Sequence, residues 1–150
     1  MPVRRPTRPG PRRTPDEIRT MRRAGRVVAE MHERLRAAIR PGVTTQQLDG
    51  LARVVLSQAG ATSNFLGYHG YPAVICASVN DVVVHGIPND TPLDEGDIVS
   101  IDCGAIVDGY HGDAAFTAPV GGVSREAQAL IDTTRRSLEA AVKQMTAGRR

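Results

Sequence analysis

The stretch IVSIDCGAIVDGYHGDAAFTAPV, residues 98–120, decides the fold. It contains two apolar runs, 98–107 and 110–120, on either side of Asp108 and Gly109. An Asp-Gly pair between two such runs favours a two-residue hairpin turn. We therefore expect two antiparallel strands joined by a tight turn.

This hairpin brings two carboxylates together. A two-residue turn pairs Asp102 with Ala115 and Asp113 with Gly104, which places both aspartates on one face as diagonal neighbours. Diagonal neighbours lie about 7–8 Å apart at the backbone. Two carboxylates that lean together from there can share one cation, or two cations about 3.5–4 Å apart. The alternative is that one aspartate caps a turn and the other forms a surface salt bridge.

The surroundings expected for Asp102 argue against that alternative. The run 98–107 is apolar on both faces, which is typical of a central strand covered on both sides. A carboxylate in such a place is unfavourable unless its charge is compensated. Oxygen ligands with room for histidine suit Mn, Fe, Co or Zn, whereas oxygen ligands alone suit Mg or Ca.

Helices flank the hairpin on both sides. Thr14 and Glu17 have the spacing of a capping box, and apolar positions then recur with a helical period until the Arg-Pro-Gly sequence at 40–42. A second helix is expected over 44–60, and a third begins at Ser124.

The segment between the second helix and the hairpin reads as a loop followed by strands. Residues 61–72 are rich in glycine and aromatic residues, and 73–79 predicts a strand. Asn80 and Asp81 then favour a turn into a further strand over 82–88. His85 falls at the end of this strand, and His69 and, in the hairpin, His111 are flanked by glycine. A lone histidine in such a place is more often structural than catalytic.

The composition is that of one globular domain. The chain has 150 residues and is 41% hydrophobic, which is enough for a real core. No apolar run approaches the roughly 20 residues of a membrane span, and we expect a cytoplasmic protein with no membrane partner. Cys76 and Cys103 lack CxxC spacing, so we expect buried, reduced thiols.

The net charge of +3 comes from the N-terminus, where residues 1–15 hold five arginines, five prolines and no acidic residue. Such a segment cannot bury enough apolar surface to fold alone, so we expect residues 1–13 to be a disordered basic tail. A second interpretation is weak electrostatic contact with RNA, for instance at the ribosome.

The segment LGYHGYPAVICASVNDVVVHGIPNDTPLDEGDIVSIDCGAIVDGYHGDAAFTAPVGG, residues 66–122, closely resembles the first half of type I methionine aminopeptidases. Residues 14–49 resemble the N-terminal helices of that family, and the match extends over about 14–148. The resemblance implies an α+β fold, the N-terminal half of a pita-bread fold, with an antiparallel sheet covered by helices. Residues 14–150 would then form the N-terminal half of the catalytic domain.

The resemblance also implies an activity and a site. The family removes the initiator methionine from nascent proteins with two divalent metal ions, for which Co, Mn, Fe and Zn are the candidates. Asp102 would chelate one ion and Asp113 would bridge both, while His85 would contact the substrate and stabilise the tetrahedral intermediate. The positions that match the pocket for the methionine side chain are Phe65, Tyr68, His69, Tyr71 and Cys76. Phe65 departs from the small residue or cysteine that is common in bacteria.

A larger departure concerns the remaining ligands. The family also uses one histidine and two glutamates as metal ligands, and these match no residue of this chain. TRRSLEAAVKQMTAGRR, residues 134–150, resembles VAEMHERLRAAIRPGVT, residues 28–44, as though a second copy of the opening helix began there. We therefore expect an N-terminal half, whose full-length form would be a monomer.

Two alternatives to this reading stay open. One is a non-catalytic half-domain, or an inactive fragment, that binds a peptide or protein partner. The other is a proline-specific aminopeptidase of the same fold. The GYHGYP loop at 67–72 and the short N-terminal extension argue against the proline-specific enzyme.

Overall fold

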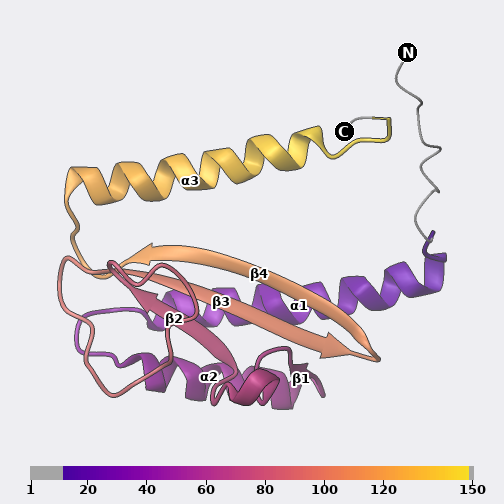
Figure 1. Ribbon diagram of the computed structural model, residues 1–150, viewed down its shortest axis with the longest axis horizontal. Coiled ribbons are helices and arrows are strands. Elements are labelled where there is room, and N and C mark those ends of the chain that lie inside the picture. The colour runs from indigo at the N-terminus through magenta and orange to yellow at the C-terminus, as the bar shows by residue number, and fades with distance from the viewer. Residues whose placement is uncertain (1–11, 149–150) are drawn as a thin grey trace.

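The computed structural model describes residues 12–148, so the expected basic tail lies almost wholly outside the described residues. The elements follow one another as α1 (Pro15–Ala38), α2 (Thr45–Gln58), β1 (Thr62–Ser63), the short 3-10 helix η1 (Tyr68–Gly70), β2 (Ile75–Val79), β3 (Ile98–Val107), β4 (Tyr110–Pro119) and α3 (Arg125–Gln144). Figure 1 shows α1 and α2 on one side of the sheet and α3 apart from both.

Side-chain caps define where the first two helices begin. The Thr14 hydroxyl accepts from the backbone N–H of Glu17 at 3.3 Å, and the Glu17 carboxylate accepts from the N–H of Thr14 at 2.7 Å. Thr44 and Gln47 form the same reciprocal pair at the start of α2. Both capping boxes confirm the starts predicted from sequence, because each satisfies backbone N–H groups that the helix leaves free.

β3 is the central strand of an antiparallel sheet. β4 pairs with it along its whole length, while β2 pairs with residues 99–103 and the short β1 with residues 105 and 106. Val107 faces Tyr110 across the turn, so the predicted two-residue hairpin and its register are confirmed.

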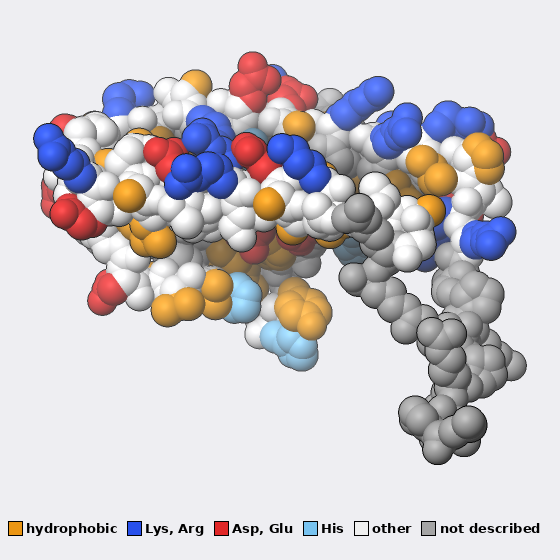
Figure 2. Space-filling model, turned by 90° about the horizontal axis from the view of Figure 1, so that it is seen from above, with side chains coloured by type: hydrophobic (Ala, Val, Ile, Leu, Met, Phe, Trp, Pro, Cys, Tyr) orange, Lys and Arg blue, Asp and Glu red, His pale blue; other side chains and the backbone are white. Residues whose placement is uncertain are grey.

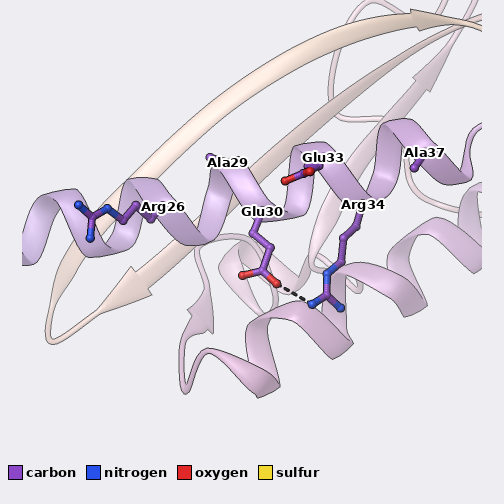
Figure 3. A pocket seen from close by; sticks show the side chains of 6 residues that line it. All are labelled: Arg26, Ala29, Glu30, Glu33, Arg34 and Ala37. Carbon is purple, nitrogen blue, oxygen red and sulfur yellow. Dashed lines mark hydrogen bonds and ion pairs between the residues drawn. The ribbon is translucent and has the colours of Figure 1, made fainter.

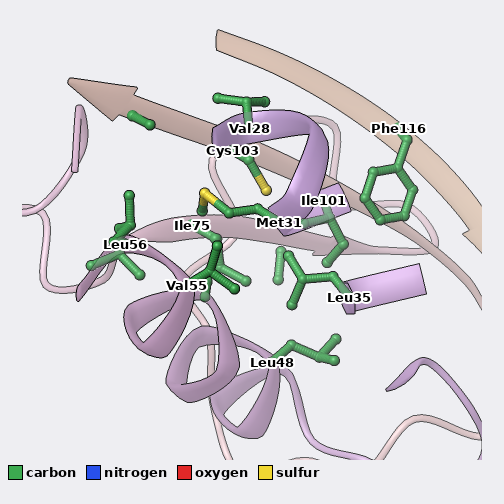
Figure 4. Packing of buried hydrophobic residues seen from close by; sticks show 14 of the residues in the cluster. Val28, Met31, Leu35, Leu48, Val55, Leu56, Ile75, Ile101, Cys103 and Phe116 are labelled. Atoms are coloured by element: carbon green, nitrogen blue, oxygen red, sulfur yellow. The ribbon is translucent and has the colours of Figure 1, made fainter. Parts of the chain in front are cut away.

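The core lies between the sheet and the two first helices. α1 packs against β3, β4 and α2, and α2 contacts β1 and β2. Figure 4 shows Met31 and Leu35 of α1 meeting Leu48 and Val55 of α2 over Ile101 of β3. The five are almost wholly buried and belong to one continuous apolar cluster, whose removal from water stabilises the fold.

Among the described residues, helices cover one face of β3 and leave the other open, which corrects the expectation of a strand covered on both sides. Val99, Ile101 and Cys103 point into the core and are buried. Ser100 and Asp102, on the opposite face, are only partly buried. Both cysteines are buried and unpaired, as predicted. Asp102 therefore lies on an open sheet surface that a ligand can reach.

The predicted strand over 82–88 is wrong. Asn80 and His85 both have positive φ values, 51° and 59°, which bend the chain out of an extended path. The segment instead returns to β2, where the N–H of Ala77 donates to the carbonyl of Gly86 at 2.9 Å. The β-branched run that suggested a strand is exposed as a result, with 87% of the Val83 surface accessible.

α3 differs from the other two long helices in its packing. It begins at Ser124 as predicted, where the Ser124 hydroxyl accepts from the N–H of Ala127 at 3.1 Å. None of its residues is buried, although apolar side chains recur along it. Within the described part of the chain, no helix is both long and apolar enough to cross a bilayer.

Candidate metal and substrate site

The two aspartates lie where the hairpin register puts them. Asp102 pairs with Ala115 and Asp113 pairs with Gly104, so both carboxylates occupy the open face of β3 and β4. Asp102 is partly buried, whereas Asp113 is exposed. The sequence prediction for the backbone positions of this pair is confirmed, because an Asp-Gly turn fixes the register of every residue behind it.

Electrostatics favour a cation beside this pair. Burial raises the pKa of Asp102, and the nearby Asp113 carboxylate raises it further. His85 and the backbone N–H of Cys103 act in the opposite direction. Two neighbouring carboxylates repel each other unless a positive charge lies between them. The charged form of Asp102 is therefore disfavoured unless a positive charge lies beside the pair.

The described residues fit a metal ion only in part. The two aspartates provide the hard oxygen donors that divalent cations accept. Within residues 12–148, however, no three His, Cys, Asp or Glu side chains gather closely enough to hold a metal. Asp102 and Asp113 alone could therefore supply only part of a coordination sphere.

β2 contributes the Cys76 thiol to the same face, and Tyr71, which lies between η1 and β2, contributes a phenol next to it. Cys76 pairs directly with Asp102, and the pKa of its thiol is raised by burial and by both aspartates. The Tyr71 hydroxyl donates to the carbonyls of Gly86 at 2.9 Å and Ile75 at 3.1 Å. Burial also raises the pKa of Tyr71, which keeps this hydroxyl protonated as a donor.

His85 is presented by a segment clamped against β2. The N–H of Gly86 donates to the buried Ser78 hydroxyl at 3.1 Å, and the Gly86 carbonyl accepts from Ala77 and Tyr71. A Cβ at residue 86 would collide with the carbonyl of Ala77. The clamp leaves His85 exposed with a left-handed backbone, a conformation that is strained and often found at functional sites.

The loop around η1 carries the remaining predicted residues. Tyr68 and His69 are exposed and their rings meet edge to face, with centroids 4.4 Å apart. Phe65 is partly buried. Figure 2 shows hydrophobic and histidine side chains together on a protrusion at the lower edge of the view. The exposed apolar residues of this loop and the His85 segment are Leu66, Tyr68, Val82, Val83, Val84 and Ile87.

Two residues that contact these groups, Asn64 and Ser78, were not predicted from sequence. Asn64 donates from its side-chain amide to the Asp113 carboxylate at 3.2 Å, and Ser78 holds the His85 segment through Gly86. Neither residue belongs to a recognisable sequence motif. Each makes its contact with a distant part of the chain, and the path of the connecting loop cannot be predicted from a single sequence. The isolated serine in the apolar run 73–79 was the one available signal.

Two surface hollows among the described residues lie away from the aspartates. Figure 3 shows one along the outer face of α1, where Glu30 and Arg34 form an ion pair at 2.6 Å. A second hollow lies beside α2 and includes Asp49, Ile87 and Pro88. Neither of these two hollows includes Asp102 or Asp113.

Comparison with curated proteins points to one kind of enzyme. Methionine aminopeptidase 1 of Mycobacterium tuberculosis is 52% identical over 141 residues, which are 93% of this chain and 53% of that protein. Methionine aminopeptidase 1 of Bacillus subtilis is 45% identical over 138 residues, 92% of this chain and 56% of that protein. The chain thus spans about half the length of the curated relatives it matches.

Solved structures agree with the architecture. Methionine aminopeptidase from Thermotoga maritima has a TM-score of 0.86 and 39% identity, over 89% of this chain and 54% of that one. Escherichia coli aminopeptidase P has a TM-score of 0.72 and 28% identity, over 85% of this chain and 28% of that one. The α+β, pita-bread architecture predicted from sequence is confirmed.

A comparison with sequence models of protein families identifies the family, because the matching model covers most of the chain. The model describes metallopeptidase family M24 and matches residues 19–150, which include both aspartates, the His85 segment and the η1 loop. The chain belongs to metallopeptidase family M24.

Proposed function

We propose that the chain is part of a methionine aminopeptidase, a metal-dependent hydrolase that removes the N-terminal methionine from nascent polypeptides. The observation that carries the proposal is the placement of Asp102 and Asp113 on one open face of the β3–β4 hairpin. Family membership supports peptidase chemistry, and relatives named methionine aminopeptidase support this substrate class.

Asp102 and Asp113 are proposed to hold two divalent ions, with Co, Mn, Fe and Zn as candidates. Bound divalent ions would lower the pKa of water and polarise the scissile carbonyl. The role of the two aspartates is to supply negative charge from a rigid hairpin. Burial of Asp102 favours a cation at this position, since its ionised form is otherwise unfavourable there.

His85 is the proposed catalytic donor of this half of the site. Its ring would donate a hydrogen bond to the oxygen on which negative charge develops during peptide cleavage. The clamp at Gly86 supports this role, because a donor held in place before the reaction need not reorganise during it. The pocket for the methionine side chain is assigned to Phe65, Tyr68, His69, Tyr71 and Cys76.

The proposed substrates, location and oligomeric state follow from the assignment as a methionine aminopeptidase. Nascent polypeptide N-termini in the cytoplasm are the proposed substrates, and the full-length enzyme is proposed to act as a monomer. The arginines of residues 1–13 are proposed to make weak contacts with ribosomal RNA, for which the charge of that segment is the support. The structure describes only the last two of those residues.

Methionine release from a Met-Ala-Ser peptide tests the activity, with Mn, Fe and Co each added in turn. The wild-type chain is compared with Asp113→Asn and with Asp108→Asn, which is the same change in the hairpin turn. We expect loss of activity in Asp113→Asn alone, because Asp108 forms an exposed salt bridge with Arg23. Activity that persists in Asp113→Asn at saturating metal would contradict the bridging role.

A second candidate function is that of a non-catalytic half-domain that binds a peptide or protein partner. The incomplete set of metal ligands within residues 12–148 favours this alternative. If the wild-type chain releases no methionine with any of the three metals, the alternative gains support over catalysis by the chain itself.

A further inference from the structure

We infer that Asn64 is a positioning residue for Asp113, whose side-chain amide fixes the carboxylate that faces the metal site. The inference rests on the proposed function, because it assigns Asp113 to the metal. Its geometric part is independent of that function. Asn64 lies between β1 and η1, in a loop that crosses the open face of the hairpin.

Two acceptors determine which way the amide points. The Asn64 Nδ2 atom donates to Oδ2 of Asp113 at 3.2 Å and to the carbonyl oxygen of Gly112 at 3.2 Å. Both partners can only accept, so the nitrogen rather than the oxygen of the amide must face them. The amide thus contacts Asp113 and the backbone just before it.

Packing holds the Asn64 side chain at this position. Gly104 pairs with Asp113 across the hairpin, and a Cβ at residue 104 would lie 2.6 Å from the Cβ, Cγ and Nδ2 atoms of Asn64. Because Gly104 has no Cβ, it leaves the space that the Asn64 side chain occupies. This contact explains why the central strand carries a glycine opposite the exposed aspartate.

The loop around Asn64 is fixed on both sides. The Ser63 hydroxyl donates to the carbonyl of Val74 at 3.3 Å and accepts from the N–H groups of Phe65 at 3.0 Å and Leu66 at 3.2 Å. The backbone on either side of Asn64 is thereby tied to Val74, the residue just before β2. Its amide is placed by the fold before any ligand arrives.

The oxygen of the Asn64 amide indicates a functional role for this residue rather than a stabilising one. The Oδ1 atom of Asn64 is buried and has no hydrogen-bond partner among the described residues. An unpaired buried acceptor is unfavourable for folding, and such groups are uncommon in native proteins. The unpaired Oδ1 atom is explained if Asn64 serves to donate from Nδ2 to Asp113.

The consequence is a carboxylate with a restricted orientation. Asp113 is exposed, so without a partner its side chain would be free to rotate. Donation to Oδ2 restrains the carboxylate. Outer-shell partners of this kind typically change metal affinity by about 10- to 100-fold when they are removed.

Two variants of the full chain test this inference, Asn64→Ala and the matched control Asn80→Ala. Asn80 also donates from its amide to an aspartate, Asp97, at 2.8 Å, but that pair lies outside the hairpin. Three-bond J couplings measure the χ1 rotamers of Asp113 in the metal-free proteins. We expect one rotamer in wild type and Asn80→Ala, and averaging in Asn64→Ala.

Calorimetric titration with Mn²⁺ supplies the second readout. We expect about 10- to 100-fold weaker binding in Asn64→Ala and unchanged binding in Asn80→Ala. A single Asp113 rotamer in Asn64→Ala, or undiminished Mn²⁺ affinity in that variant, overturns the inference. If wild type binds no Mn²⁺ and releases no methionine, the proposed function fails, and the χ1 result alone decides whether Asn64 positions Asp113.

Discussion

At the scale of single residues, Glu17 links the start of α1 to the tip of the hairpin. Its carboxylate accepts from the N–H of Thr14 at 2.7 Å, from the Tyr110 hydroxyl at 2.8 Å and from Arg13 at 3.2 Å. These contacts, the Thr14 N–H above all, lower the pKa of Glu17 from 4.5 to about 2. The charged form is thus favoured in the folded state.

Glu17→Gln is therefore expected to change the pH dependence of stability. A carboxyl whose folded pKa is lowered stabilises the fold above its unfolded pKa, and this contribution is lost as the pH falls from about 4.5 toward 2. We expect a lower melting temperature than wild type at pH 7 and a shrinking difference over that range. Circular dichroism melts at pH 7, 4 and 2.5 measure both effects.

Glu33→Gln is the control for this prediction, because Glu33 is a carboxylate on the exposed outer face of α1. It should leave the melting temperature nearly unchanged at every pH. A difference between wild type and Glu17→Gln that is constant with pH would mean that Glu17 acts through packing rather than through its charge.

The positions of single residues could be predicted from sequence where a local turn determines them. The positions of Asp102 and Asp113 followed from one Asp-Gly turn, since every paired residue behind it is then fixed. Asn64 could not be found in this way. Its contact with Asp113 joins residues 49 positions apart, and the loop that brings them together has no local signature.

At the scale of elements, the close approach of α1 to β4 is allowed by a missing side chain. A Cβ at Gly112 would lie 2.7 Å from the carbonyl carbon of Ala24 and 2.8 Å from the backbone nitrogen of Gly25. These atoms belong to helix backbone and cannot rotate away. The distance between α1 and the sheet thus depends on Gly112.

Gly112→Ala is expected to destabilise the protein by about 1–3 kcal/mol, the usual range for overpacking a well-packed contact. Gly25→Ala is a control of opposite sign, because a Cβ there meets no atom within 4 Å. It should stabilise α1 by about 0.5–1 kcal/mol through its helix propensity. Urea unfolding measures both changes, and a neutral Gly112→Ala would show that α1 is farther from β4 than described.

The elements themselves were predictable to different degrees. Helix starts were identified because Thr14 and Thr44 each satisfy N–H groups within three residues of their own position. The strand expected over 82–88 failed because tertiary contacts outweighed β-propensity. The Gly86 N–H donates to the Ser78 hydroxyl, and the Gly86 carbonyl accepts from the Ala77 N–H, so that segment is held in a loop. No pattern within the segment predicts these contacts.

At the scale of the whole molecule, the chain consists of one packed body and one helix with little support. α1, α2 and the sheet share a continuous core, whereas α3 buries no residue. Figure 1 shows α3 set apart from α1 and α2. Leu138 of α3 is 60% exposed, while Leu35 of α1 is fully buried. Local stability should follow this division, because regions with few buried contacts open at low free-energy cost.

Two leucine variants test this division. Leu35→Ala should cost about 2–5 kcal/mol, because it opens a cavity in the core. Leu138→Ala should change the free energy of unfolding by no more than about 0.5 kcal/mol, as is usual at the surface. Urea unfolding measures the pair, and hydrogen exchange should show faster exchange in Arg125–Gln144 than in Pro15–Ala38. If Leu138→Ala cost as much as Leu35→Ala, the apolar side of α3 would have to be covered in solution.

The apolar side of α3 could be covered by a second copy of the chain or by packing within the chain, and measurements at several protein concentrations distinguish the two. A destabilisation that grows with concentration indicates a second copy, and a constant destabilisation indicates packing within the chain.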